Sequence, residues 1–235
     1  IVSRYDLTAL KHKGLTYFYV DMKTPGIEAK PIKQISGSAN FNEVFFNDVR
    51  IPDSQRIGAE GDGWKVSLTT LMNERLAVGD PPGLDFDQIF EASKEIEVED
   101  GLAVKNSEVR QKMADWYIQS RGLQYTKYRS MTALSKGQTP GPELSISKLV
   151  TASKMQDVSS YALDLMDMSG MVHQDKNPIL KNLFQNGYFF SAAMRIAGGT
   201  DEVLRNIIAE RVLGLPQDER SDKKLPFNEL PSGKN

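Results

Sequence analysis

The first 57 residues carry the alternation of apolar and polar positions that is typical of antiparallel strands. β-Branched and aromatic side chains gather in short runs, and glycine, proline or an Asn-Asp pair interrupts the chain every few residues. The pattern predicts a small antiparallel β module. Its predicted strands are 15–20, 27–30, 41–46 and 49–51.

After Gly58 the apolar positions recur with the period of an α-helix. The apolar stripe of the first predicted helix comprises Trp64, Leu68, Leu71 and Val78. The run at 80–83, Asp-Pro-Pro-Gly, ends or kinks this helix because proline has no N–H to donate. Further amphipathic stretches predict helices at about 86–97, 107–136, 143–170, 178–194 and 201–213.

The two periods together predict an α+β fold that is mainly α: a small antiparallel β-domain followed by an antiparallel bundle of the four-helix type. We expect the β part to cover 1–57 and the bundle to cover 58–216. The polar segment 217–235 is expected to be a flexible tail.

Composition narrows the possible chemistry. The net charge of −2 lacks the basic field of a general nucleic-acid binder. Without cysteine and with only two histidines, no thiolate or multi-histidine metal site can form, so we expect no metal. No apolar run approaches the roughly 20 residues that span a bilayer, and no signal-peptide pattern is present, which favours a cytoplasmic protein. His12, in a polar loop, is expected to be solvated, and His173 to cap a helix end or be exposed.

Two charged residues stand out on the first predicted helix. With successive residues about 100° apart, Arg75 falls in the centre of the apolar stripe and Glu74 at its edge, beside Leu71. One interpretation is a surface glutamate and an arginine that extends over the rim of the core. The other is a carboxylate base in an apolar cleft, with its pKa tuned by desolvation and by Arg75. The residues alone leave both interpretations open.

A second unusual segment opens the last predicted helix, where 197–202 reads Ala-Gly-Gly-Thr-Asp-Glu. Gly198 and Gly199 let the backbone approach a ligand closely, and Thr200 is a good N-cap. The N–H groups of a helix start favour an anionic or carbonyl-rich ligand. The segment equally fits a well-capped helix without a ligand, in which Asp201 and Glu202 complement the helix dipole.

Four runs resemble the acyl-CoA dehydrogenase family, and together they extend over nearly the whole chain. KGLTYF at 13–18 and NFNEVFFNDVRIP at 40–52 are similar to the family's middle β-domain. GDGW at 61–64 resembles the opening of the helical C-terminal domain. IAGGTDEVLRNIIAERVLGLP at 196–216 is similar to the family's final helix.

The resemblance implies FAD and the oxidation of an acyl-CoA thioester at Cα–Cβ. In most members the base that removes the α-proton is a glutamate at the position that Gly198 occupies here, and glycine has no side chain. A second branch carries the base on the first helix of the C-terminal domain, where LMNERL at 71–76 places Glu74. The resemblance also implies that Arg75 and Leu71 lie beside the acyl pocket. It implies that Gly198, Gly199, Thr200 and Glu202 lie along the flavin.

The sequence departs from the family in its cofactor anchors. The stretch 85–105 lacks the usual Arg with a following Phe-Gly, and 163–170 lacks the usual Gln with a following Gly-Gly. Some bacterial members without these anchors form mixed tetramers, several of which act on bulky or sterol-derived acyl-CoA, and this chain resembles them. We therefore expect a homo- or heterotetramer that passes electrons to an electron-transfer flavoprotein, with FAD shared with, or bound by, a partner subunit.

Two alternatives stay open at this point. One is a non-catalytic or half-site partner subunit, which the missing anchors favour. The other is a flavin monooxygenase or oxidase on the same fold, against which Glu74 weighs, because hydroxylation needs no α-proton base. The family's N-terminal helical domain and Trp-Thr/Ser flavin motif have no counterpart in 1–235. We therefore expect this chain to be part of a longer protein, cut before Ile1, and to be inactive alone.

Overall fold

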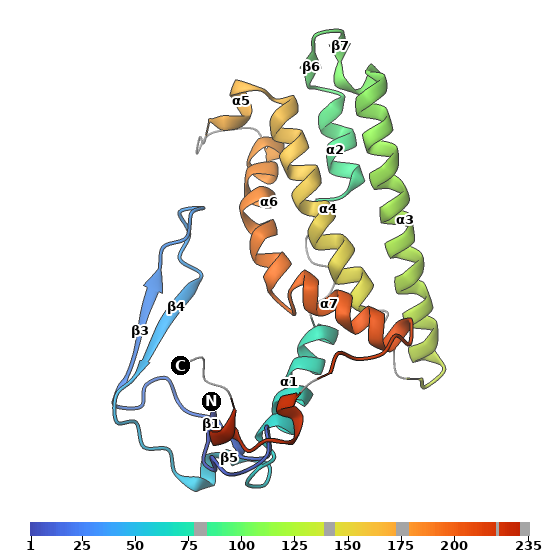
Figure 1. Cartoon of the computed structure of the whole chain (residues 1–235). Helices are drawn as coiled ribbons and strands as arrows, with labels where there is room; N and C mark the ends of the chain where they lie inside the picture. The colour runs from blue at the N-terminus through green and yellow to red at the C-terminus, as the bar shows by residue number, and fades with distance from the viewer. Residues whose placement is uncertain (78–83, 139–143, 173–178, 220, 231–235) are drawn as a thin grey trace. The chain divides into compact units, whose positions relative to one another are not determined.

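The structure of the chain is a computed structural model that describes residues 1–77, 84–138, 144–172, 179–219 and 221–230 (Figure 1). It divides into two compact units. The first comprises Ile1–Gly79 together with Asp218–Asn235, and the second comprises Asp80–Gln217. The boundary thus follows the first helix of the predicted bundle, whereas the sequence pattern placed it before that helix, at 57/58.

The first unit contains two small antiparallel sheets. β1 (Val2–Arg4), β2 (Leu15–Phe18) and β5 (Arg56–Ile57) form one sheet in the order β1-β2-β5. β3 (Ile27–Ile32) and β4 (Phe41–Phe46) form a separate hairpin, in which Ile27 pairs with Phe46 and Ile32 with Phe41. The predicted strands at 15–20, 27–30 and 41–46 are confirmed. The predicted strand at 49–51 is wrong, because the chain enters β5 only after Pro52, which cannot donate to a ladder, and a 3₁₀ turn at Asp53–Gln55.

Gly26 lies just before β3, at the open end of the β3–β4 hairpin. Its φ of 91° is in the left-handed region, and a Cβ there would overlap the carbonyl oxygen of Asn47. The N–H of Asn47 donates to the carbonyl of Gly26 at 2.8 Å. Every residue of β4 is nonetheless exposed, including Phe41 at 54% and Phe46 at 48%. The hairpin therefore leaves much apolar surface uncovered within the first unit.

α1 (Gly63–Ala77) packs on β2, and its start lies close to that strand. A Cβ at Gly63 would lie 2.7 Å from backbone atoms of Leu15, so only glycine fits. The His12 ring stacks on Trp64, with centroids 4.1 Å apart and planes at 13°. His12 is half-buried by this contact, so the prediction of a solvated side chain is wrong.

The described part of the C-terminal tail packs back on the first unit. The N–H of Asn228 donates to the carbonyl of Leu7 at 3.0 Å, and Phe227 lies under the guanidinium of Arg4 at 3.8 Å. Leu10 and Pro226 form an isolated antiparallel bridge. This pairing differs from the flexible tail expected from its polarity, because Pro226 and Phe227 supply apolar surface inside a polar segment.

The second unit is helical. Its described helices are α2 (Phe86–Ser93), α3 (Ser107–Ser135), α4 (Leu144–Leu165), α5 (Met168–Met171), α6 (Ile179–Ile196) and α7 (Asp201–Ile207). The helix predicted at 86–97 ends earlier, and β6 (Glu97–Val98) with β7 (Gly101–Leu102) follows as a short hairpin. The helix predicted at 143–170 breaks at Asp167, whose φ is 48°. The last predicted helix ends in a π-helical turn at Ile208–Val212.

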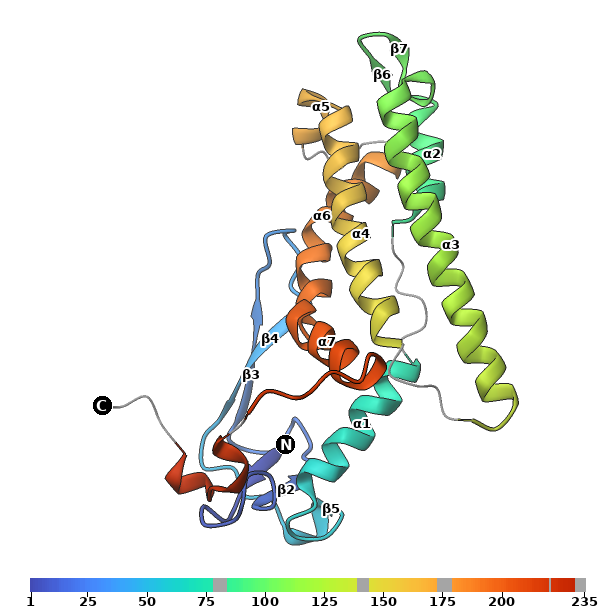
Figure 2. The same cartoon turned by 45° about the vertical axis from the view of Figure 1, so that its right-hand side comes forward.

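α4 lies between α3 and α6 and also contacts α2, α5 and α7 (Figures 1 and 2). Burial of apolar side chains between these helices supplies the main stabilisation. The core around α4 comprises Ile89, Met113, Trp116, Met155, Val158 and Phe184. Within the described ranges, no helix has the length and apolarity needed to cross a membrane. The breaker at 80–83 and His173 lie outside the described residues.

A buried ammonium group connects three of these helices. The Lys154 side chain on α4 is 2% exposed, and its Nζ donates to Asp85 Oδ1 at 2.8 Å and to Ser120 Oγ on α3 at 2.9 Å. Ser120 Oγ also contacts Asp85 Oδ1. Asp85 is the N-cap of α2, and Gln88 completes its capping box. Burial alone would raise the pKa of the Asp85 carboxyl, but the hydrogen bonds from Lys154 and Ser120 outweigh it and hold this pKa below its usual value.

Removing one charged member of this network should lower the free energy of unfolding far more than removing both charges together. Asp85→Ala leaves the Lys154 ammonium buried without a carboxylate, and we expect the free energy of unfolding to fall by about 3 kcal/mol. In Asp85→Ala/Lys154→Met the buried charge is gone as well, so most of the loss should be recovered. Urea unfolding followed by circular dichroism measures both. Equal losses in the single and double variants would contradict this account.

An exposed ion pair on α2 offers a matched control for that experiment. Lys94 Nζ lies 2.7 Å from Glu91 Oε1, and both side chains are exposed. Glu91→Ala should change the free energy of unfolding by less than about 1 kcal/mol, because water already screens this pair.

Two glycines inside helices make a second matched comparison. A Cβ at Gly122 on α3 would meet nothing within 4 Å, so Gly122→Ala should stabilise the unit by about 0.5–1 kcal/mol through the higher helix propensity of alanine. At Gly187 on α6 a Cβ would lie 2.6 Å from Ser159 Oγ and would collide with the buried Leu84 side chain. Gly187→Ala should therefore destabilise by about 1–3 kcal/mol. Thermal or urea unfolding that ranks the two variants in the opposite order would refute this packing.

Candidate functional site

The predicted base and its neighbours lie on the second half of α1. The backbone is helical from Gly63 to Ala77, so Leu71, Glu74 and Arg75, at spacings of three and four residues, share one face. Leu71 is 48% exposed, and the side chains of 72–77 lie outside the described residues. Trp64, at 41%, and Leu68, at 43%, are exposed as well. The described residues of this face are therefore only partly covered within the first unit.

The second predicted segment forms a sharp turn between α6 and α7. Gly198 and Gly199 have φ values of 68° and 107°, which favour glycine at both positions. Thr200 is the N-cap of α7, as predicted, since its side chain accepts from the N–H of Val203 at 3.3 Å. A Cβ at Gly198 would meet nothing within 4 Å, and Gly198 is exposed. At Gly198 the turn therefore exposes backbone atoms to solvent.

An ion pair supports the turn on its α7 side. Asp201 is 3% exposed, and its Oδ2 accepts from Arg195 Nε at 2.7 Å. Arg195 also donates to Gln156 Oε1 on α4 at 2.7 Å. The other oxygen of Asp201, Oδ1, is buried and has no hydrogen-bond partner among the described residues. These contacts tie the start of α7 to α6 and α4.

A lysine on α4 holds the turn from its other side. Lys148 Nζ donates to the carbonyl oxygen of Gly199 at 2.7 Å. Burial lowers the pKa of Lys148, and the nearby guanidinium of Arg195 adds to this, while Asp201 opposes it. Nothing in the sequence pattern indicated Lys148, Arg195 or Gln156 as part of this segment. No local signal marks Lys148, because it lies 51 positions before its partner.

Glu202 points to solvent. Its side chain is 78% exposed, and it lies 3.8 Å from Arg205 one turn later. A hydrogen bond from its own backbone N–H, then one from Thr200, holds its pKa below the usual value. This is the behaviour of an acidic residue in the first turn of a helix.

The two predicted sets of residues belong to different compact units. Leu71, Glu74 and Arg75 are in the first unit, and 198–202 are in the second. The structure brings Gly198, Gly199, Thr200 and Glu202 together in one turn. The helix that carries Glu74 belongs to the other unit.

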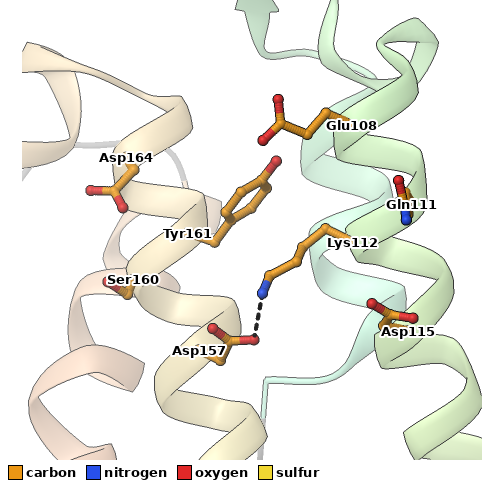
Figure 3. A pocket seen from close by; sticks show the side chains of 8 residues that line it. All are labelled: Glu108, Gln111, Lys112, Asp115, Asp157, Ser160, Tyr161 and Asp164. Carbon is orange, nitrogen blue, oxygen red and sulfur yellow. Dashed lines mark ion pairs between the residues drawn. The ribbon is translucent and has the colours of Figure 1, made fainter.

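A groove of about 400 Å³ lies between α3 and α4 (Figure 3), and neither predicted set lines it. Its charged residues are Glu108, Asp115, Asp157, Asp164 and Lys112. Lys112 lies 3.4 Å from Asp157, whose Oδ2 also accepts from Trp116 Nε1 at 2.8 Å. The excess of negative charge would repel the phosphates of CoA or of FAD, which disfavours this groove as their site. Among the described residues, no group of three or more His, Cys, Asp or Glu is arranged to hold a metal ion.

A β-rich unit followed by an antiparallel helical unit with a Gly-Gly-Thr turn before its last helix defines the class of this protein. Residues 61–213 match the family model "Acyl-CoA dehydrogenase, C-terminal domain". The chain therefore belongs to the acyl-CoA dehydrogenase family, which confirms the resemblance found in the sequence.

Two relatives cover nearly all of the chain. Acyl-CoA dehydrogenase FadE34 of Mycobacterium tuberculosis is 33% identical over 218 residues, which are 92% of this chain and 29% of the relative. Acyl-CoA dehydrogenase IpdE1 of Mycolicibacterium smegmatis is 33% identical over 222 residues, which are 93% of this chain and 53% of the relative. The chain thus spans about half the length of its relatives, or less.

Solved structures share the fold. The Tcur3481-Tcur3483 steroid ACAD has a TM-score of 0.76 at 20% identity, with 93% of this chain and 56% of that chain covered. The ChsE4-ChsE5 complex from Mycobacterium tuberculosis has a TM-score of 0.74 at 19% identity, with 93% and 57% covered. These similarities confirm the mainly helical fold with small antiparallel sheets.

Proposed function

We propose that this chain is the C-terminal part of an FAD-dependent acyl-CoA dehydrogenase subunit that uses Glu74 as its base. The observation that carries the proposal is that a carboxylate is absent from the turn before α7 but present on α1. Gly198 has no side chain where most family members have their glutamate, whereas α1 carries Glu74 one turn after Leu71. The carboxylate of Glu74 takes the α-proton, and the electrons of the broken Cα–H bond form the Cα=Cβ double bond. FAD, when bound, would supply the acceptor for the β-hydrogen, which leaves as hydride.

The neighbours of Glu74 suit this role. Leu71, three residues earlier on the same face, supplies apolar surface for the acyl chain. Arg75, the next residue along the helix, adds a positive charge to this part of the sequence. A base must lie within hydrogen-bond reach of the proton it removes, and a helix positions its side chains more rigidly than a loop does.

The turn at 198–200 fits a flavin edge. The absence of side chains at Gly198 and Gly199 leaves room for a flat ring against the backbone, and Thr200 adds a hydroxyl at the start of α7. Glu202 stays at the exposed border of the segment. These residues would hold and orient the cofactor, and none of them would take part in proton removal.

We further propose that the subunit works in a tetramer with a different subunit, shares its FAD site with it and passes electrons to an electron-transfer flavoprotein. Residues 85–105 form α2 and the β6–β7 hairpin and contain no Arg with a following Phe-Gly. The exposed apolar side chains of α1 and β4 favour burial by another chain. The similar structures named ChsE4-ChsE5 and steroid ACAD favour a mixed assembly and a bulky acyl-CoA substrate. A non-catalytic partner subunit remains the second candidate function.

Glu74→Gln in the full-length assembly tests the base. We expect flavin bleaching by acyl-CoA to slow by at least about 100-fold, because the amide cannot take a proton, while acyl-CoA binding still perturbs the flavin spectrum. Stopped-flow absorbance measures both. Glu95→Gln, at an exposed position after α2, is the matched control and should reduce flavin at the rate of the unmodified protein. Reduction by Glu74→Gln at that same rate would exclude Glu74 as the base.

The FAD content of the purified assembly tests the shared site. We expect the full-length protein alone to bind little FAD, because the usual anchors are missing, and the complex with the product of a neighbouring gene to bind it stoichiometrically. Absorbance and native mass spectrometry count FAD per tetramer. A homotetramer that holds four FAD would rule out the half-site arrangement and the non-catalytic role together.

A further inference from the structure

We propose that Lys148 is a positioning residue that fixes the conformation of the Gly198–Thr200 turn through the carbonyl of Gly199. The consequence for FAD rests on the proposed function, whereas the effect on the turn itself does not. Lys148 lies on α4, outside every segment that resembles the family's flavin and acyl-CoA motifs.

The hydrogen bond is a strong one for its kind. Its length of 2.7 Å is typical of a charge-assisted bond, which is roughly twice as strong as a neutral bond. Lys148 is half-buried, so less water competes for its ammonium group than at a fully exposed position. A lysine in this position gives up hydration, and the carbonyl of Gly199 replaces it.

The turn needs such an external contact. Gly198 and Gly199 both have positive φ, and glycine is the residue with the largest choice of backbone conformations. A Cβ at Gly198 would meet nothing within 4 Å, so no side-chain packing restrains this position. Lys148 selects one orientation of the peptide that joins Gly199 to Thr200, because its Nζ is attached to the rigid helix α4.

Arg195 completes the restraint from the other side. It binds the buried carboxylate of Asp201 and the side chain of Gln156, so the first residue of α7 is held to α6 and α4. The Gly199 carbonyl accepts from a charged donor, and this polarises its peptide and makes the N–H of Thr200 a stronger donor. The N–H of Thr200 has no acceptor in the described part of the chain.

Hydrogen–deuterium exchange of the flavin-free full-length protein tests the restraint directly. In Lys148→Met we expect the amides of Val203 and Leu204, which bond to Thr200, to exchange about tenfold faster, as the loss of one charge-assisted bond predicts. Lys148→Arg should restore slow exchange. Lys105→Met, at an exposed position in the same unit, should leave it unchanged. Equal exchange in Lys148→Met and the unmodified protein would overturn the proposal.

Flavin binding by the complete assembly is the second readout. We expect Lys148→Met to bind FAD about tenfold more weakly and to shift the flavin absorbance, and Lys148→Arg to behave like the unmodified protein. Unchanged affinity and spectrum in Lys148→Met would overturn the link to flavin and leave the proposed function standing. If the unmodified assembly binds no FAD, the proposed function fails, and the exchange data still decide the role of Lys148. Should Lys148→Met not fold, Lys148→Gln, which keeps a neutral donor, is held to the same outcomes.

Discussion

The ammonium group of Lys154 is the constraint on which the helical unit depends. It lies inside the bundle on the helix that contacts every other helix of the unit, where water cannot solvate it. Its hydrogen-bond partners are Asp85, the N-cap of α2, and the hydroxyl of Ser120 in the middle of α3. Apolar side chains tolerate several packings of similar volume. Directional hydrogen bonds to a charge tolerate few, so Lys154 restricts how α2, α3 and α4 can lie together.

The same helix carries the second inward lysine, and the two have different effects. Lys154 acts within the core, whereas Lys148 acts at its edge, on the backbone of the turn before α7. The hydrogen bonds of Lys154 help to fix α4 in the bundle. Lys148, on the same helix, can therefore restrain the two consecutive glycines of the turn. The conformation of the turn therefore depends on the packing of the bundle as well as on the turn's own residues.

Local signals made much of the fold predictable. Helical periodicity located the helices, Thr200 marked the start of α7, and Asp85 with Gln88 is a capping box that can be read from the sequence. The same approach failed at 49–51, where the structure has no strand, and at the tail, where Pro226 forms a bridge with Leu10. It could not find Lys154 and Asp85, which are 69 positions apart, because only the folded bundle brings them together. Glu74 and the Gly-Gly-Thr segment could be singled out as candidates because their pattern is local and because a family resemblance gave it meaning.

The restraint of the turn is larger than a helix cap requires. Thr200 alone satisfies the N–H of Val203, and an exposed cap of this kind contributes about 1 kcal/mol. Here two cations are partly removed from water around the turn, and one oxygen of Asp201 is buried without a hydrogen-bond partner among the described residues. Each of these features opposes folding unless something else offsets it. Structural features that cost stability are concentrated where a protein binds or reacts. The support of the Gly198–Thr200 turn by Lys148 and Arg195 therefore favours a functional backbone surface there over a simple helix start.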